Sequence, residues 1–228
     1  MMQIPLPLGP DPLRTFNNFL PGGNTAAVEH LRELVLPAAP VYLWGPAGSG
    51  KTHLLRALAQ RDPAQHTAWF EAGLPLPWQL PAAALLVVVD RCDELEPAEQ
   101  QAAFALFVEA VTQDAQVAAA GRVPPVDLPL RDDLRTRLGW GHVHALQLLS
   151  DEHIGAALRC EAERRGFGLS DEVTNYLLTR FPRDLAYLMP LFDRLDDFAL
   201  SLARPVTVPL LRLMLAEFSV PVDRAVRL

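Results

Sequence analysis

The sequence has little of three things: cysteine, positive charge and long hydrophobic runs. Its 228 residues include only two cysteines, Cys92 and Cys160. Two are too few for a disulfide scaffold, and no Cys/His cluster has the spacing of a zinc site. We therefore expect both to be small core residues in a reducing compartment.

Basic residues are outnumbered, with 20 Lys and Arg against 27 Asp and Glu and a formal net charge of −7. Such a balance argues against the broad basic surface that neutralises DNA phosphates. No apolar run is long enough to cross a bilayer, and the start of the chain does not resemble a signal peptide. We expect a cytoplasmic protein that has no membrane partner and meets DNA only indirectly.

What the sequence does contain is a phosphate-binding loop. A strand-like run, Val41 to Trp44, precedes it and a helical pattern follows it, so backbone N–H groups should point at anionic phosphates. Lys51 is expected to reach the β- and γ-phosphates, and the Thr52 hydroxyl to bind Mg²⁺. The motif G-x-x-x-x-G-K-[ST] is matched at every fixed position by Gly45, Pro46, Ala47, Gly48, Ser49, Gly50, Lys51 and Thr52.

An acidic partner for this loop follows the apolar run from Leu85 to Val89. Asp90 ends that run, where a P-loop protein needs a carboxylate to hold Mg²⁺ through water. The next position, where hydrolytic relatives carry a second acid, is Arg91. Asp93 and Glu94 remain open as substitutes. We expect tight nucleotide binding with weak intrinsic hydrolysis, because losing a general base typically costs about 10²–10⁴-fold in rate.

Apolar spacing divides the chain into a mixed part and a helical part. Strands are expected at 41–44, 67–70, 85–89 and 116–120, the last also readable as helix, with helices at 24–35 and 98–111. Only helices follow, led by Ser150, by Ser170, by Asp184 and by Pro209. The fold class is therefore α/β, a central parallel sheet flanked by helices and followed by a small all-helical domain. The expected divisions are a flexible tail at 1–14, a base at 15–149 and a helical domain at 150–228.

Five segments together resemble the Hda family of DnaA-related AAA+ proteins. Two are the phosphate loop and the strand that ends in Asp90. The others are 15–22, which in this family lies near the adenine, the stretch 124–141 with its paired prolines, and 181–185. The likeness covers nearly the whole chain and implies an AAA+ P-loop module with a helical lid.

The resemblance implies a negative regulator of DNA replication initiation that binds ADP, or ATP, with Mg²⁺. It places an arginine finger at Arg137, acting in trans on ATP bound to the initiator DnaA, and a phosphate-contacting lid arginine at Arg183. The chain departs from the family at the positions of the polar sensor residues, which are occupied here by the largely apolar stretch Ala119-Ala120-Gly121-Arg122. This departure, like Arg91, argues against self-catalysed hydrolysis and leaves diphosphate binding intact.

The N-terminal residues resemble the hexapeptide that binds the bacterial sliding clamp, the β subunit of DNA polymerase III. Gln3, Leu6 and Leu8 occupy the fixed positions. A peptide stiffened by two prolines loses little entropy on docking, and two leucines suit an apolar pocket. This reading makes the protein an adaptor that the loaded clamp recruits.

Two other functions compete with an adaptor. A DnaA-like initiator or a loader-type ATPase would act directly on DNA or on a helicase, but the expected basic helix-turn-helix domain does not follow before Leu228. A metabolic P-loop kinase would have no use for a clamp peptide. The sequence leaves open self-association, the preference for ADP or ATP, and whether the chain is itself an ATPase.

Overall fold

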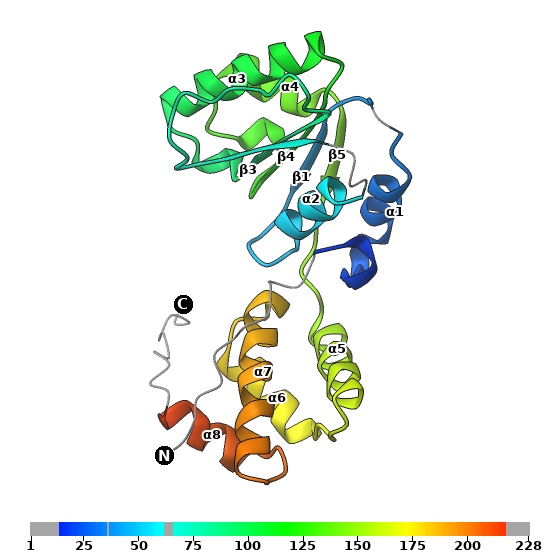
Figure 1. Cartoon of the computed structure of the whole chain (residues 1–228), viewed down its shortest axis with the longest axis vertical. Coiled ribbons are helices and arrows are strands. Elements are labelled where there is room, and N and C mark those ends of the chain that lie inside the picture. The colour runs from blue at the N-terminus through cyan, green and yellow to red at the C-terminus, as the bar shows by residue number, and fades with distance from the viewer. Residues whose placement is uncertain (1–13, 36, 62–65, 218–228) are drawn as a thin grey trace. The chain divides into compact units, whose positions relative to one another are not determined.

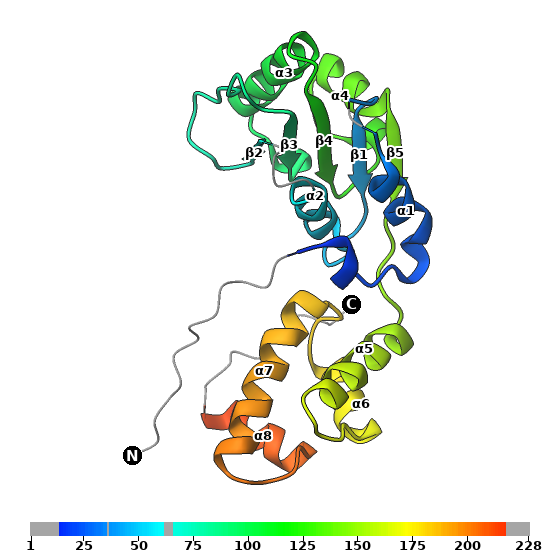
Figure 2. The same cartoon turned by 45° about the vertical axis from the view of Figure 1, so that its right-hand side comes forward.

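The computed structural model describes residues 14–35, 37–61 and 66–217. The chain divides into two compact units, Met1–Gln147 and Leu148–Leu228. Figures 1 and 2 show both units. The predicted clamp-binding peptide with Gln3, Leu6 and Leu8 lies outside the described residues.

Unit 1 is built on a parallel sheet whose five strands run in the order β2-β3-β4-β1-β5. Helices α1 and α2 pack on one face of the sheet, and α3 and α4 pack on the other (Figure 2). Its elements are α1 (Thr25–Glu33), β1 (Val41–Trp44), α2 (Lys51–Ala59), β2 (Thr67–Glu71), β3 (Leu86–Asp90), α3 (Pro97–Thr112), β4 (Gln116–Gly121), α4 (Asp132–Gly139) and β5 (His142–Ala145).

The strand pattern of unit 1 confirms the predicted α/β class. Residues Gln116–Gly121 form a strand with every residue buried, which settles the helix alternative for this segment. The sequence did not predict β5. Its residues, His-Val-His-Ala, are mostly exposed on an edge strand, so they lack the apolar run that marks the buried strands.

Unit 2 is all helical and has its own apolar core. Ser150 caps the first helix, since its Oγ accepts a hydrogen bond from the His153 backbone N–H at 3.3 Å, and Ser170 caps the second in the same way. These caps agree with the starts expected from the sequence. The helices are α5 (Asp151–Arg164), α6 (Asp171–Arg180), α7 (Leu185–Ser201) and α8 (Val208–Glu217).

The two cysteines differ from expectation. Cys92 is buried, but Cys160 is exposed on α5, so the expectation of two core cysteines is wrong for Cys160. Helix α5 buries Ile154, Leu158 and Ala162, and residue 160 falls on the opposite face of a helix with 3.6 residues per turn. In the described part of the chain, no helix is both long and apolar enough to span a membrane.

Three histidines meet between α1 and the edge strand β5. The ring centroid of His30 lies 4.4 Å from that of His142 and 4.9 Å from that of His144. The Nε2 atoms of His30 and His144 are buried and find no hydrogen-bond partner among the described residues. Burial lowers the pKa of both rings, the neighbouring histidines lower it further, and Glu33 opposes the shift at His30.

We expect this cluster to make the protein less stable in mild acid. The pKa values of His30 and His144 are lower in the folded protein than in the unfolded chain, so the unfolded chain takes up protons first as the pH falls. The free energy of unfolding that the neutral cluster contributes is therefore fully present above about pH 6.5 and is lost at lower pH. Urea unfolding at a series of pH values above the sequence pI of about 5.3 measures this loss. His30→Gln should flatten the profile, whereas His66→Gln, at an exposed histidine outside the cluster, should leave it unchanged. Equal slopes in all three proteins would contradict the assignment.

Candidate nucleotide-binding site

The phosphate loop joins β1 to α2, as the sequence predicts. Gly50, the residue before the helix, has φ +91°, and a Cβ there would lie 2.5 Å from the Phe19 ring. Gly45 has φ +149°, and a Cβ there would collide with the Leu146 carbonyl oxygen. Side chains rarely adopt such φ values, so both positions require glycine for backbone geometry and for space.

Lys51 is the only lysine in the sequence. Its ammonium folds back over the loop and donates hydrogen bonds to the carbonyl oxygens of Gly45, at 2.7 Å, and of Pro46, at 2.8 Å. Burial lowers the pKa of Lys51, and the carboxylate of Asp90 opposes that shift. The loop therefore holds one positive charge where phosphate oxygens would bind.

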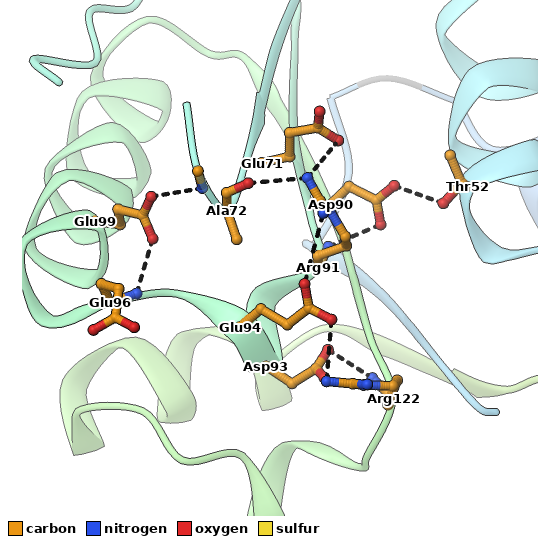
Figure 3. Close-up of polar contacts among 11 residues, drawn as sticks. Thr52, Glu71, Ala72, Asp90, Arg91, Asp93, Glu94, Glu96, Glu99 and Arg122 are labelled. Atoms are coloured by element: carbon orange, nitrogen blue, oxygen red, sulfur yellow. Dashed lines mark hydrogen bonds and ion pairs between the residues drawn. The ribbon is translucent and has the colours of Figure 1, made fainter. Parts of the chain in front are cut away.

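Thr52 and Asp90, the two predicted Mg²⁺ residues, lie in direct contact. The Thr52 hydroxyl in the first turn of α2 donates to Asp90 Oδ2 at 2.6 Å, and the backbone N–H of Arg91 donates to the other carboxylate oxygen at 2.9 Å (Figure 3). Asp90 is buried at the end of β3. A hydroxyl and a carboxylate are oxygen ligands of the kind Mg²⁺ prefers, so this pair fits the ion. No group of three or more His, Cys, Asp or Glu that could hold a metal occurs among the described residues. Waters and substrate phosphates are the usual further ligands of Mg²⁺.

The segment that enters the module packs on the start of α2. The ring of Phe19 lies 5.2 Å from that of His53, and His53 Nε2 contacts the Thr15 carbonyl oxygen at 2.9 Å. Burial lowers the pKa of His53, and the contact with the Thr15 carbonyl oxygen opposes that shift. Residues Thr15 to Phe19 therefore lie beside the phosphate loop, and contact of this segment with an adenine stays a prediction.

An ion network occupies the positions that follow Asp90 (Figure 3). Arg91 has left-handed backbone geometry, contacts Glu71 at 3.5 Å and Glu94 at 3.6 Å, and donates to the Ala72 carbonyl oxygen. Arg122 binds both oxygens of Asp93, through its Nε at 2.5 Å and its backbone N–H at 2.9 Å.

The network includes both residues that could substitute for the missing second acid. Arg122 also contacts Glu94 at 3.1 Å, so both Asp93 and Glu94 are paired with arginines. Ala119 and Ala120 are fully buried in β4. The pairing of Arg122 with Asp93 was not predicted from the sequence, because the two residues are 29 positions apart and no local pattern links them.

Arg137 lies on α4 and is half-buried, with its guanidinium 5.0 Å from the centroid of the Phe104 ring on α3. Two other arginines of this stretch are held by carboxylates, Arg131 by Asp133 at 2.7 Å and Arg135 by Asp132 at 2.6 Å. Within the described residues Arg137 makes no ion pair, so its charge, unlike those of Arg131 and Arg135, is not neutralised by a neighbouring carboxylate.

Arg183 belongs to unit 2 and not to the unit that carries the phosphate loop. Its Nε lies 2.8 Å from Asp151 Oδ1 at the start of α5, and both side chains are about half exposed. The two residues line a polar cavity of about 260 Å³ in this unit, together with Glu152, Arg159, Thr174, Asn175, Leu178 and Thr179. The phosphate contact of Arg183 stays a prediction.

Comparisons with known proteins identify the family. Residues 151–215 match the family model described as "Hda, lid domain". An uncharacterized protein of Haemophilus influenzae is 31% identical over 226 residues, which cover 93% of this chain and 98% of that protein. This chain is an Hda-like, DnaA-related AAA+ protein. The matched lid residues fall within unit 2, and the resemblance read from the sequence is confirmed.

Solved structures agree with the Hda-like assignment at the level of the fold. Domain III of the Thermotoga maritima replication initiation protein DnaA has a TM-score of 0.71 and 21% identity, and the match covers 92% of this chain and 99% of that one. AMPPCP-bound DnaA from Aquifex aeolicus has a TM-score of 0.64 and 21% identity, over 82% of this chain and 66% of that one. The predicted AAA+ base with a helical lid is confirmed.

Proposed function

We propose that this protein is a cytoplasmic AAA+ adaptor that restrains replication initiation by promoting hydrolysis of ATP bound to DnaA. The observation that carries the proposal is Arg137, a half-buried arginine that has no ion pair among the described residues and lies beside two arginines that carboxylates neutralise. An arginine supplied in trans stabilises the charge that develops on a transferring phosphoryl group, an effect worth about 10³–10⁵ in rate. Membership of the Hda-like family supports DnaA as the partner.

The chain's own nucleotide has a structural role in this proposal. ADP, or ATP, would lie on the phosphate loop with Lys51 on its phosphates, and Mg²⁺ would be held by Thr52 and, through water, by Asp90. The DnaA from Aquifex aeolicus binds AMPPCP, which supports a nucleotide on this fold. Arg183 would contact a phosphate from the lid.

Recruitment is the second half of the proposal. Gln3, Leu6 and Leu8 would dock on the sliding clamp, so that the chain acts only where a clamp is loaded on DNA. The decisive assay measures turnover of DnaA-bound ATP with this protein, the clamp and DNA, each omitted in turn. Hydrolysis that needs all three components supports the adaptor, whereas tight DNA binding without the clamp would favour a direct initiator or loader.

We expect the purified protein to hydrolyse ATP very slowly by itself. Arg91 stands where a second acid would follow Asp90, and the nearby Asp93 and Glu94 are paired with arginines, so neither of these two carboxylates is free to activate water. Release of inorganic phosphate from ATP and Mg²⁺, measured without clamp or DnaA, should stay far below the roughly 10 per second of a median enzyme. Turnover of several per second would contradict this reading of the network.

A further inference from the structure

Exposed apolar side chains surround the C-terminal end of α4. Trp140, the residue that caps this helix, is 75% exposed, and Val126 in the short helix Pro125–Asp127 is 74% exposed. The two segments touch, because a Cβ on Gly139 would lie 3.2 Å from Cβ of Pro125. Trp140 and Val126 therefore flank one contact between α4 and the loop before it.

Trp140 also lies one helical turn from Arg137. Its backbone N–H donates to the Arg137 carbonyl oxygen at 3.4 Å, and residues three apart on a helix are neighbours on one face. The chain that follows is fixed, since a Cβ on Gly141 would collide with the Pro40 carbonyl oxygen. The residue that follows Trp140 is therefore packed against the backbone of Pro40.

Single exposed apolar residues are ordinary on a protein surface. An exposed tryptophan beside an arginine that lacks a carboxylate is a different arrangement, because tryptophan and arginine dominate the residues that carry the energy of interfaces. Among the described residues the guanidinium of Arg137 has no carboxylate partner and is available to an anion of a partner protein, whereas the charges of Arg135 and Asp132 cancel locally. The fitting partner surface therefore carries an anionic group bordered by apolar side chains.

We propose that Trp140, supported by Val126, is the anchor that docks the nucleotide-loaded partner module on the Arg137 face. The occupant is the P-loop face of a second module carrying a nucleoside triphosphate, whose phosphates supply the anion. The inference rests on the proposed function and gives the two residues different roles. Trp140 supplies binding affinity for the partner, and Arg137 promotes the hydrolysis of its nucleotide.

The test separates these two roles by titrating ATP-loaded DnaA, in the presence of loaded clamp, with the wild type and three variants. Trp140→Ala should raise the concentration needed for half-maximal hydrolysis at least about tenfold and leave the saturated rate unchanged. Arg137→Ala should lower the saturated rate and leave the concentration for half-maximal hydrolysis unchanged. Leu200→Ala, a matched control at a 72% exposed apolar residue of α7, should change neither.

Each outcome decides a separate point. If Trp140→Ala gives the same titration curve as the wild type, this inference is overturned. It is also overturned if the variant loses self-association, because the indole would then belong to an interface between copies of this chain. An unchanged saturated rate in Arg137→Ala would instead overturn the proposed function. Because Trp140 is largely exposed, its removal should leave the melting temperature unchanged, which shows that a weaker titration does not come from misfolding.

Discussion

Replacing Arg137 with alanine is expected to lower the hydrolysis of DnaA-bound ATP by about 10³–10⁵-fold. The structure makes this variant clean, because the side chain gives up only its contact with the Phe104 ring, an interaction worth about 0.5–1 kcal/mol at an exposed site. Folding, ADP binding and clamp binding should therefore persist. The measurement is single-turnover hydrolysis of ATP preloaded on DnaA.

Two further variants sharpen the test of Arg137. Arg137→Lys should rescue poorly, because a compact ammonium does not reproduce the planar fork of guanidinium donors. Arg135→Ala is the matched control on the same helix, since that arginine is already paired with Asp132. If Arg135→Ala abolished hydrolysis while Arg137→Ala retained most of it, the finger would have to be reassigned to Arg135.

Lys51→Ala is expected to weaken ADP binding by about 100-fold or more, because hydrogen bonds to charged groups contribute about 1.5–3 kcal/mol each and the ammonium serves more than one phosphate oxygen. Calorimetric titration with ADP and Mg²⁺ measures the loss. Arg56→Ala removes a cation from the same helix, but that guanidinium stacks on Trp69 away from the loop, so its ADP affinity should be unchanged. Unaltered affinity in Lys51→Ala would remove the nucleotide assignment.

The single lysine permits an independent check of the same site. An amine-acylating reagent should modify Lys51, whose pKa is lowered by burial, and ADP with Mg²⁺ should protect it. Mass spectrometry of the Lys51 peptide separates this product from acylation of the N-terminal amine. Equal modification with and without nucleotide would contradict the site, even in a protein that is fully folded.

Much of the fold could be predicted because its signals are local. Helix caps such as Ser150 and Ser170 act through side chains and backbone atoms three residues apart, and buried parallel strands such as β3 read as continuous apolar runs. Strand β5 was not predicted from the sequence, because its pairing with β1 is decided by its position at the edge of the sheet and not by its own composition. Cys160 was misplaced because burial depends on which face of α5 meets the core.

The sequence alone determined the nucleotide chemistry of this protein. Eight consecutive residues specify a phosphate loop, since close approach of backbone to phosphate needs glycines and a lysine at fixed spacing, and an apolar strand that ends in Asp90 specifies the acidic partner. Only the tertiary structure brought Thr52 to Asp90, paired Asp93 with Arg122 and left Arg137 without an ion pair among the described residues, three residues from an exposed Trp140. Contacts of this second kind join residues far apart in the chain or depend on which neighbours are already paired, and no local pattern encodes either.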